Sequence, residues 1–518
     1  MAESIGLKIN DPKFWDKADL RAETDRIYEI CNGCRLCFKF CDSFPTIFKN
    51  IDKISEQRQA DHLKAHPELI ELAKQKRAEA AARGEVVPEG VENAEVMGDE
   101  LPELSAHAKD LPDSVREKAL DECFQCKLCY PNCPYTPPHE FALDFPRLLL
   151  RQKAQRVREK GVSLTKKILR NPDFIAKIGS NFPFFMNLGN TNALNRAIME
   201  WTIGIAREKL LPQYHWNTFP SWWKKHEPKV EALLPAREGV DASKLMPAKV
   251  ALFSTCLVNW NDPTAGKAAV EVLEHNGIEV AWPKQQICCG MPFLDEGDIE
   301  AAKVNVECNA KALLEYVKQG YEVVIPSPSC SLMIREEYPQ ILGTQDAKLL
   351  AKHSHDLSDY LFKLKREGRI KRDFKERYDK LKYHIPCHIK AQNIGLRGKD
   401  LLEMVADEVD GVDACSGHDG TWSMMKQNHQ ASLKWGSKLF DGIVRGDGPE
   451  KTPRGQFGEP CSGACGDCHL AATQVKEATG IEMTHPIVAL AKAYGFDVGK
   501  QAARLKGKPV QTQSEPAA

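Results

Sequence analysis

The feature that most constrains this chain is a run of four cysteines with the spacing C-x2-C-x2-C-x3-C, which Pro134 follows. The run consists of Cys123, Cys126, Cys129 and Cys133. The same spacing occurs upstream at Cys31, Cys34, Cys37 and Cys41, with Asp42 in place of the proline. Intervals of three residues let three thiolates of one short loop point at one small object. Two such runs favour a metal cluster, because zinc more often uses two separate CxxC pairs.

Both runs resemble the [4Fe-4S] loops of bacterial two-cluster ferredoxins. In that family the fourth cysteine of each run ligates the other cluster. The resemblance implies a first cluster on Cys31, Cys34, Cys37 and Cys133. It implies a second cluster on Cys123, Cys126, Cys129 and Cys41. We therefore expect a helical ferredoxin-like domain made of residues 1–50 and 118–160.

The length, the net charge and the distribution of apolar residues narrow the class of protein. A chain of 518 residues is long enough for several domains. Lys and Arg total 71 against 72 Asp and Glu, a net charge of −1, which argues against bulk nucleic-acid binding. The first ten residues lack the apolar core of a signal peptide, and no apolar run approaches the roughly 20 residues of a membrane span. We expect a cytoplasmic protein, soluble or peripheral on the inner face of the membrane, whose clustered cysteines are metal or redox groups.

Two segments outside the cysteine runs are predicted from composition. Residues 51–117 form an insertion that begins as a charged, Ala-rich helix over 55–83 and continues as a loop over 84–103. An inert surface excursion is favoured there over a partner-binding element, since long loops cost little once their ends are held. The polar residues 501–518 are predicted to be a disordered tail.

Residues 161–245 are predicted to be a basic and amphipathic helical linker. Nine Lys and Arg side chains stand between Arg147 and Arg170 against one acid, Glu159. Apolar residues then follow at helical spacing, with Trp201 among them. A basic run beside an apolar, Trp-containing stretch is typical of an interfacial membrane helix. The alternative is a linker that packs on the flanking domains and leaves its basic face in water.

From Lys249 onward the pattern predicts α/β structure in two copies, residues 246–375 and 376–500. Short apolar strands end just before cysteines, where open α/β sheets place their sites. In the first copy these are Cys256, the pair Cys288-Cys289 followed by Gly290, and Cys330. The second, weaker copy carries Cys387, Cys415-Ser416-Gly417, Cys461, Cys465 and Cys468. Adjacent cysteines followed by glycine suit a multinuclear cluster better than a single tetrahedral ion.

The pattern Cys256, 31 residues, Cys288-Cys289-Gly290, then Cys330 resembles the cysteine-rich CCG domain. That domain occurs in the B subunit of heterodisulfide reductase and in the C subunit of anaerobic glycerol-3-phosphate dehydrogenase. Together with the ferredoxin runs, the layout resembles the latter protein, or the C and B subunits of heterodisulfide reductase fused. The resemblance implies a multidomain α+β fold: a two-cluster ferredoxin-type helical domain, a helical linker, and duplicated α/β CCG domains.

The chain departs from the family pattern in both repeats. The motif usually closes with CxxC, but Ser331, Leu332 and Met333 follow Cys330, and Ser416 replaces one cysteine of the second pair. The thiolates of repeat one (Cys256, Cys288, Cys289, Cys330) can still hold a cluster. Those of repeat two (Cys387, Cys415, Cys465, Cys468, with Cys461 as an extra candidate) can hold a cluster or zinc. Alternatively the two repeats pool their ligands at one site.

Three further side chains are candidates for a role near these motifs. Cys308 lies in a helical pattern and is expected to be a buried core thiol. His388 follows Cys387, and His418 follows the Cys-Ser-Gly group. Each can move protons or orient a ligand, but a surface or capping histidine is the commoner role.

The predicted function is electron transfer. The sequence shows no GxGxxG loop and no P-loop, so substrate chemistry requires a partner, either a redox protein or a flavin dehydrogenase subunit. The resemblance implies a quinone or another acceptor at the far end of the path. One alternative is a thiol/disulfide reductase of the heterodisulfide type acting at the CCG cysteines. Another, of a different class, is a zinc-binding structural protein. Catalytic residues are not predicted.

Overall fold

The computed structural model describes residues 6–83, 104–445, 453–499 and 501–510. Its contacts divide the chain into two compact units, each of which is described by itself. The large unit consists of Met1–Trp15, Phe124–Asn132 and Leu150–Ala518. The small unit consists of Asp16–Cys123 and Cys133–Leu149. The second cysteine run is thus divided, because Cys126 and Cys129 belong to the large unit.

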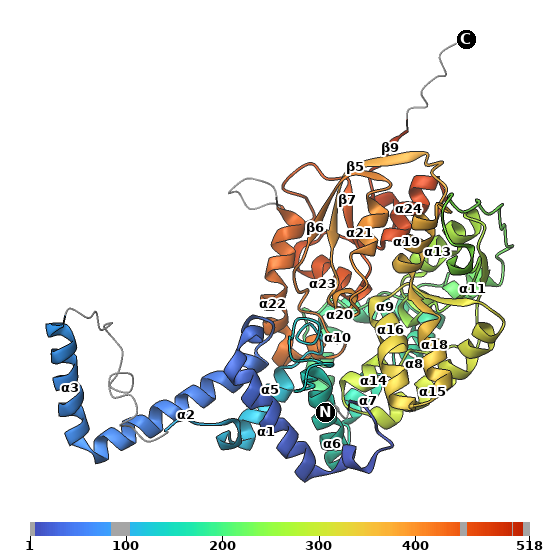
Figure 1. The fold of residues 1–518 in the computed structure, drawn as a ribbon. Helices are drawn as coiled ribbons and strands as arrows, with labels where there is room; N and C mark the ends of the chain where they lie inside the picture. Colours follow the sequence, from blue (N-terminus) through green and yellow to red (C-terminus); the bar gives the residue numbers. More distant parts are fainter. Residues whose placement is uncertain (1–5, 84–103, 446–452, 500, 511–518) are drawn as a thin grey trace. The chain divides into compact units, whose positions relative to one another are not determined.

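The large unit contains two parallel sheets with the same strand order (Figure 1). The first has the order β2-β1-β3-β4, with β1 Lys249–Leu252, β2 Glu279–Ala281, β3 Glu322–Ile325 and β4 Ser354–Asp356. The second has the order β6-β5-β7-β8, with β5 Glu376–His384, β6 Ala406–Val412, β7 Gly463–Gly466 and β8 Met483–Thr484. All of these pairings are parallel. The expected α/β architecture is confirmed, and the repeated strand order is what an internal duplication produces.

Helices connect these strands in each repeat. The first has α12 Cys256–Trp260, α13 Pro263–His275, α14 Met291–Asp295, α15 Ile299–Lys318, α16 Pro328–Leu332, a π-helical turn Met333–Glu337, α17 Tyr338–Leu342, α18 Gln345–Lys352 and α19 Leu357–Glu367. The second has α20 Cys387–Ala391, α21 Arg397–Leu402, the 3-10 turn Trp422–Met424, α22 Lys426–Val444, α23 His469–Thr479 and α24 Pro486–Tyr494. One buried cluster joins β1 and α13 to β5 and α24, so the two repeats share a core.

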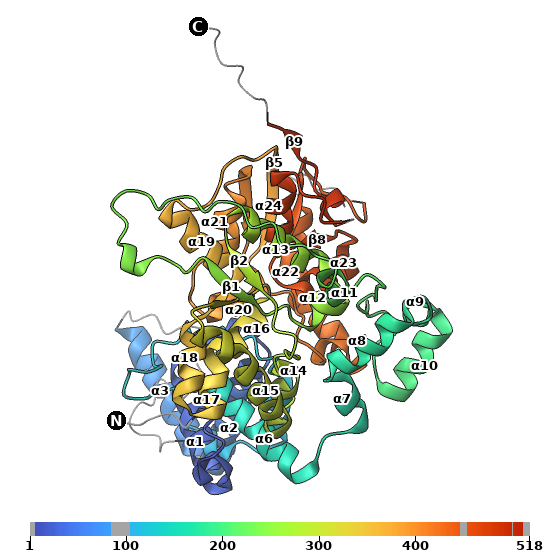
Figure 2. The same cartoon turned by 90° about the vertical axis from the view of Figure 1, so that its right-hand side faces the viewer.

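The linker residues form short helices that belong to the large unit. They are α7 Leu164–Leu169, α8 Pro172–Asn181, α9 Pro183–Thr191, α10 Ala193–Ile203 and α11 Phe219–Trp223, followed by a 3-10 turn Ala242–Lys244. Prolines at the first positions of α8 and α9, and the caps Asn171 and Asn192, explain why the apolar stretch breaks into separate helices. Figure 2 shows α9 and α10 continuing from α8, which packs beside α12.

The apolar side chains of α8–α10 are mostly exposed rather than packed on the repeats. The exposed set, which we call the apolar face, is Phe174, Ile178, Phe182, Phe184, Phe185, Leu188, Leu194, Ile198 and Trp201. Trp201 is 87% exposed and Phe185 is 70% exposed. This arrangement differs from the linker alternative, in which these side chains pack on neighbouring domains. Within the described residues, no helix combines the length and apolar character needed to span a bilayer.

The basic run is largely used inside the large unit. Arg151 is buried and donates from Nε to the carbonyl of Phe14 at 2.7 Å. Lys153 Nζ donates to the carbonyl of Asp295 at 2.9 Å, and Lys166 pairs with Glu296 at 2.5 Å. Arg170 pairs with Asp298. The interpretation of this run as a free cationic patch is therefore wrong for these four side chains.

The small unit is helical in the part described. It contains α1 Lys17–Cys34, a 3-10 turn Leu36–Lys39, α2 Ser43–Ala65, α3 Pro67–Ala82, a 3-10 turn Ala108–Asp110 and α5 Asp113–Glu122. The helix α6, Phe145–Lys160, begins in this unit and ends in the large one. Phe44 and Phe145 stack in its core with ring centroids 4.4 Å apart. The predicted helix over 55–83 corresponds to the end of α2 and to α3, which begins at Pro67, while the predicted loop 84–103 lies outside the described residues.

Both ends of the chain add ordered structure to the large unit. Pro12–Trp15 form a 3-10 turn, and Phe14 is buried. Residues 501–510, predicted to be disordered, instead form a 3-10 turn Ala502–Arg504 and strand β9 Lys508–Pro509, which pairs antiparallel with β5. Burial of Leu505, 2% exposed, in the shared core anchors this segment. The polar composition of the tail predicted disorder, whereas the apolar residue Leu505 is what marks this segment as ordered.

Candidate metal centre

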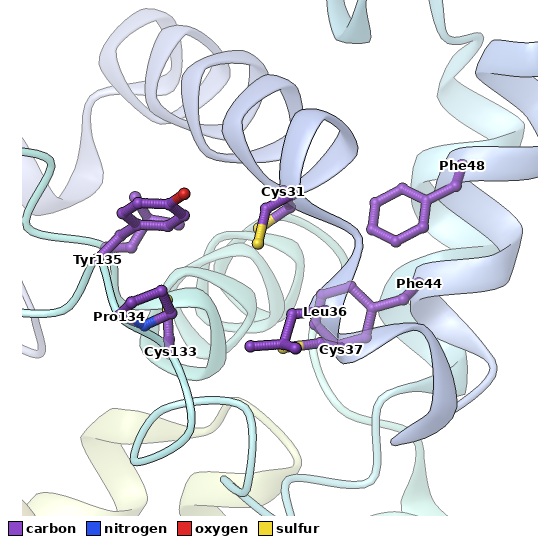
Figure 3. A pocket seen from close by; sticks show the side chains of 10 residues that line it. Cys31, Leu36, Cys37, Phe44, Phe48, Cys133, Pro134 and Tyr135 are labelled. Atoms are coloured by element: carbon purple, nitrogen blue, oxygen red, sulfur yellow. The ribbon is translucent and has the colours of Figure 1, made fainter.

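Four cysteines from both runs line one cavity of the small unit (Figure 3). They are Cys31, Cys34, Cys37 and Cys133. Cys31 and Cys34 lie in the last turn of α1, Cys37 lies in the following 3-10 turn, and Cys133 comes from the second run. The remaining lining is mainly apolar: Leu36, Phe44, Phe48, Pro134, Tyr135 and Leu143. This is the set predicted for the first cluster, with the fourth ligand supplied by the other run.

The thiols of this cavity are crowded and shielded from water. Burial, together with the neighbouring thiols, raises the pKa of Cys31, and the same causes raise the pKa of Cys37 to about 12. Burial also raises the pKa of Cys133. Thiolates gathered in an apolar cavity repel one another unless a cation offsets their charge. Four sulfur donors around an apolar space therefore fit an iron–sulfur cluster, which is held by four thiolates.

The two cysteine runs share a backbone conformation. Arg35 and Lys127 each follow the second cysteine of their run, and both adopt positive φ, 53° and 60°. In each case the carbonyl of that residue accepts a hydrogen bond from the amide three residues later, Phe38 and Tyr130. Left-handed residues tighten the chain between cysteines, which directs successive thiols to the same side. The sequence similarity of the runs thus extends to their local geometry.

The predicted ligands of the second cluster divide between the units. Cys41 and Cys123 lie in the small unit, where burial and Cys123 raise the pKa of Cys41 to about 12. Cys126 and Cys129 lie on the segment Phe124–Asn132 of the large unit. The four-ligand set therefore stays a prediction from the resemblance.

The segment Phe124–Asn132 is anchored in the large unit by three contacts. The ring of Phe124 lies 5.3 Å from that of Trp422. The carbonyl of Gln125 accepts a hydrogen bond from Nε2 of His388 at 3.2 Å. Lys127 forms a buried ion pair with Glu337. The loop that carries Cys126 and Cys129 is thereby fixed against both repeats.

In repeat one the four predicted ligands form a chain of neighbouring sulfurs. Cys288 lies within hydrogen-bonding reach of Cys256 and Cys289, and Cys289 within reach of Cys330. Hydrogen bonds from Cys256 and Cys289 hold the pKa of Cys288 well below its usual range, although burial opposes this. The bond to Cys288 raises the pKa of Cys256, and bonds to Cys288 and Cys330 raise that of Cys289. Four converging sulfur donors suit a multinuclear centre.

The Cys288-Cys289 loop is held by residues that sequence reasoning missed. Asn309 Nδ2 donates to the carbonyl of Cys288 at 3.0 Å, and its Oδ1 accepts from the amide of Ile287 at 2.8 Å. Tyr338 donates to the carbonyl of Cys289 at 2.9 Å. Asp173, on α8, accepts from the amide of Cys288. Burial and the nearby Cys288 raise the pKa of Asp173 to about 6.

Repeat two brings together Cys387, Cys415 and Cys468. Burial raises the pKa of Cys387, and Cys415 and Cys468 lie close enough to raise it further. Cys330 of repeat one likewise acts on Cys468. The sulfurs of the two repeats thus approach each other, as pooled ligands require. Within the described residues, no group of three or more His, Cys, Asp or Glu side chains is placed to hold a single metal ion.

The structure places the other two cysteines of repeat two elsewhere. Cys465 lies within β7, buried, with its sulfur 3.7 Å from Oγ1 of Thr484. Cys461 has its sulfur 3.1 Å from the carbonyl of Gly463. Cys308 was predicted to be a buried core thiol, but it lies on α15 and is only partly buried.

The glycines of the Cys288-Cys289-Gly290 and Cys415-Ser416-Gly417 motifs have equivalent roles. Gly290 has φ of 96° and Gly417 has φ of 69°. The amide of Gly290 donates to Cys288, and that of Gly417 donates to Cys415 Sγ at 3.2 Å. Cys415 is therefore the structural counterpart of Cys288, and Ser416 the counterpart of Cys289.

His388 is buried, which corrects the expectation of a surface side chain, whereas His418 is half-buried. His388 is 8% exposed, and its Nδ1 lies 2.9 Å from Oγ of Ser329. Burial, with a further effect of Lys127, lowers the pKa of His388 to about 4. Burial also lowers the pKa of His418, whose Nδ1 has no hydrogen-bond partner among the described residues.

Comparisons with known proteins agree with this arrangement. The family model for the cysteine-rich domain, CCG, matches residues 250–335, the part that holds Cys256, Cys288, Cys289 and Cys330. The C subunit of anaerobic glycerol-3-phosphate dehydrogenase from Escherichia coli (strain K12) is 26% identical over 425 residues, covering 73% of this chain and all of that protein. Lactate utilization protein A of Bacillus subtilis (strain 168) is 32% identical over 188 residues, covering 34% of this chain and 75% of that protein.

Proposed function

The chain belongs to the family of cysteine-rich CCG-domain proteins that includes lactate utilization protein A and the C subunit of anaerobic glycerol-3-phosphate dehydrogenase, and we propose that it is an iron–sulfur protein of electron transfer. In this proposal electrons pass between a partner dehydrogenase or redox protein and a quinone or other acceptor. A role in redox chemistry follows from the family, whereas the partner and the acceptor are part of the proposal.

One observation carries the proposal. The loop of Cys126 and Cys129 is built into the same unit as the CCG cysteines. His388, which follows Cys387, reaches the backbone of Gln125, which precedes Cys126. Ferredoxin-type and CCG-type donors are thus joined through a buried hydrogen bond. Neither a zinc-binding scaffold nor an isolated thiol enzyme requires that connection.

The proposed clusters use the donor sets described above. Cys31, Cys34, Cys37 and Cys133 would hold one [4Fe-4S] cluster, and Cys123, Cys126, Cys129 and Cys41 a second. Cys256, Cys288, Cys289 and Cys330, with Cys387, Cys415 and Cys468 nearby, would hold a further centre. When bound, such clusters supply one-electron redox chemistry whose potentials follow burial and hydrogen bonding to sulfur. The chain itself contributes that burial, and the amides of Gly290 and Gly417 donate to sulfur.

Membrane docking is the second part of the proposal. Eight of the nine side chains of the apolar face lie on three consecutive helices, α8–α10, and Phe182 lies between α8 and α9. The stretch from Pro172 to Ile203 contains only four charged residues, namely Asp173, Lys177, Arg196 and Glu200. Three of these four point inward, since Arg196 and Glu200 are buried and Asp173 holds the CCG loop. Fully burying one Phe or Leu side chain contributes about 1.5–3 kcal/mol. Such a surface suits peripheral attachment to a bilayer interface.

The thiol/disulfide reductase alternative is less well supported. A disulfide substrate must reach a nucleophilic thiolate, and Cys288, the thiolate favoured by its hydrogen bonds, is 2% exposed. Cys289 beside it is 3% exposed. Buried sulfurs of this kind suit electron transfer, which does not require contact with the substrate.

The test is the metal and sulfide content of the full chain purified without oxygen, followed by electron paramagnetic resonance of the same sample. We expect about twelve irons and matching sulfide per chain, four for each cluster. We expect a paramagnetic signal of the two ferredoxin-type clusters, which appears on reduction. We also expect a second, distinct signal from the CCG centre. Zinc without iron would overturn the proposal. About eight irons would restrict it to the ferredoxin-type clusters and leave the CCG cysteines as thiols.

A further inference from the structure

A cavity of about 640 Å³ lies between the two repeats of the large unit, and no cysteine lines it. Its walls come from the segment Leu210–Asn217, from the start of α13 and from α23. Val498, Gly499, Gln501 and Arg504, in and near the C-terminal 3-10 turn, add to the lining. Leu257 and His469 both line it, and they directly follow Cys256 and Cys468. The cavity therefore adjoins a candidate ligand of each repeat.

Among the residues that the structure describes, all but one of the charged groups of the cavity wall have a partner. Glu482 pairs with Lys476 and Arg504, and Asp262 lies 3.2 Å from Nε2 of His469. Lys267, on α13, has no ion-pair or hydrogen-bond acceptor within the part of the chain that the structure describes. Burial lowers the pKa of Lys267. A partly desolvated ammonium without a partner gains from an acceptor oxygen placed in the cavity.

The rest of the lining includes apolar side chains, which favour a ligand with an apolar body. They are Leu210, Leu211, Pro212, Leu257, Pro263, Leu470, Met483 and Val498. Pockets of this kind bind small molecules by enclosing apolar surface and orienting it through a few polar groups. A ligand that presents a carbonyl oxygen to Lys267 and a ring to these walls matches both features.

The same cavity wall is tied to the helices of the apolar face. On one side, Asn187 of α9 makes two hydrogen bonds with the backbone of Tyr214, each 2.9 Å long. On the other side, Asn261 donates to the carbonyl of Gln213 at 2.9 Å, and the amide of Leu210 donates to Glu477 at 2.8 Å. One segment, Leu210–Asn217, thus connects α9 with the cavity.

We propose that this cavity is the binding site of a quinone, with the ammonium of Lys267 as donor to a quinone carbonyl. The inference rests on the proposed function and names the place where its acceptor binds. Reduction of the quinone would take two electrons from the cysteine-held centres and two protons from water at the open side of the cavity, and the quinol would leave without a bond to the protein.

The test measures binding and does not depend on electron transfer. The probe is 2-heptyl-4-hydroxyquinoline N-oxide, a quinol mimic whose fluorescence is quenched when a protein binds it, titrated into the full chain. We expect saturable quenching at one site per chain. Lys267→Met should raise the Kd at least about tenfold, the loss of roughly one charged hydrogen bond. Lys267→Arg, which keeps a donor, should stay close to the unmodified protein.

Lys348→Met is the matched control, because Lys348 is an exposed lysine on α18 that does not line the cavity. It should leave the Kd unchanged. Absence of saturable quenching, or the same Kd for Lys267→Met and the control, would overturn the cavity assignment. Iron content reports separately on the proposed function, so a protein that holds iron but does not bind the probe refutes this inference alone.

Discussion

His388 donates from Nε2 to the backbone carbonyl of Gln125, across 263 positions of sequence, at 3.2 Å. Since burial lowers the pKa of His388 to about 4, the ring is neutral near pH 7 and carries one proton. A carbonyl can only accept, so the proton lies on Nε2, and Nδ1 accepts from the hydroxyl of Ser329 at 2.9 Å. The imidazole of His388 therefore connects Gln125, which precedes Cys126, with Ser329, which precedes Cys330. His388 itself directly follows Cys387 in the sequence.

Replacing His388 with Ala should destabilise the large unit. The buried carbonyl of Gln125 and the partly buried hydroxyl of Ser329 would lose their partners, and a buried group left without a partner costs about 1–3 kcal/mol. His388→Gln can restore the donor to Gln125 and should recover about half of the loss. Urea midpoints of the three proteins give the comparison. A His388→Ala protein as stable as the unmodified chain would show that the connection contributes nothing to the fold.

Cys468→Ser should remove metal from the CCG half, whereas Cys465→Ser should not. Cys468 lies near Cys387 and Cys330, while the Cys465 sulfur faces Thr484 within β7. The iron content per chain distinguishes the Cys468→Ser and Cys465→Ser variants, and Cys308→Ser serves as the control. We expect about four irons fewer for Cys468→Ser, the content of one cluster, and no change for Cys308→Ser. Loss of iron in Cys465→Ser with retention in Cys468→Ser would reverse this assignment.

The sequence predicted what local spacing encodes. The cysteine runs, the strands that end before Cys256 and Cys330, and the duplication all follow from patterns within a few tens of residues. Asp173 and Asn309 were missed because they reach the Cys288 loop from 115 and 21 positions away, and no local pattern marks such a partner. Strand β7 was missed because its sequence, Gly-Ala-Cys-Gly, lacks the β-branched residues that mark strands.

The linker shows a different limit. Helical periodicity identifies an apolar face but not what covers it, so the exposure of Phe185 and Trp201 was undecided from sequence. The basic run was misjudged for a related reason. Charge counts cannot tell a solvated arginine from Arg151, which is buried against the backbone of Phe14. Both outcomes depend on tertiary packing.

Gly417→Ala should disrupt the second cysteine loop. Its φ of 69° is strained for alanine, and the added Cβ would lie 1.8 Å from the carbonyl oxygen of Ser432. The matched control is Gly239→Ala, with φ of 83° and no atom within 4 Å of the added carbon. The control should lose only about 1–2 kcal/mol, the strain of the left-handed conformation. Thermal midpoints and iron content should both fall further for Gly417→Ala, and equal losses would contradict this account.

Acid should destabilise the protein partly through His485. Burial, with His469 nearby, lowers the pKa of His485 to about 3, while an unfolded histidine titrates near 6.5. Between these values the unfolded chain binds a proton that the folded chain excludes, so this part of the stability is complete above pH 6.5 and is lost as pH falls. One unit below 6.5, at pH 5.5, the loss is about 1.4 kcal/mol.

The variant His485→Asn isolates this effect. Nδ1 of His485 caps α24 by accepting from the amide of Ile487 at 3.1 Å, and asparagine keeps such a cap without titrating. The difference in urea midpoint between pH 7.5 and 5.5 should therefore be smaller in the variant. An identical difference in both proteins would mean that His485 is protonated in the folded state.

Replacing Phe184 and Phe185 with Asp should release the chain from lipid vesicles. Both rings belong to the apolar face, 66% and 70% exposed, and neither supports the repeats. Deleting the helices instead would remove Asp173 from the Cys288 loop, so loss of binding could not be told from misfolding. Point changes avoid that ambiguity.

The measurement is flotation with vesicles of phosphatidylethanolamine and phosphatidylglycerol. Burial of one Phe contributes about 1.5–3 kcal/mol, so losing two should weaken binding well beyond tenfold. Val304→Asp is the matched control, because Val304 is an apolar side chain on α15 that is 63% exposed and lies outside α8–α10. Since docking depends mainly on apolar contact, raising the salt concentration should leave most of the bound fraction in place. Binding that salt abolishes, or that the double variant retains, would place the attachment on another surface.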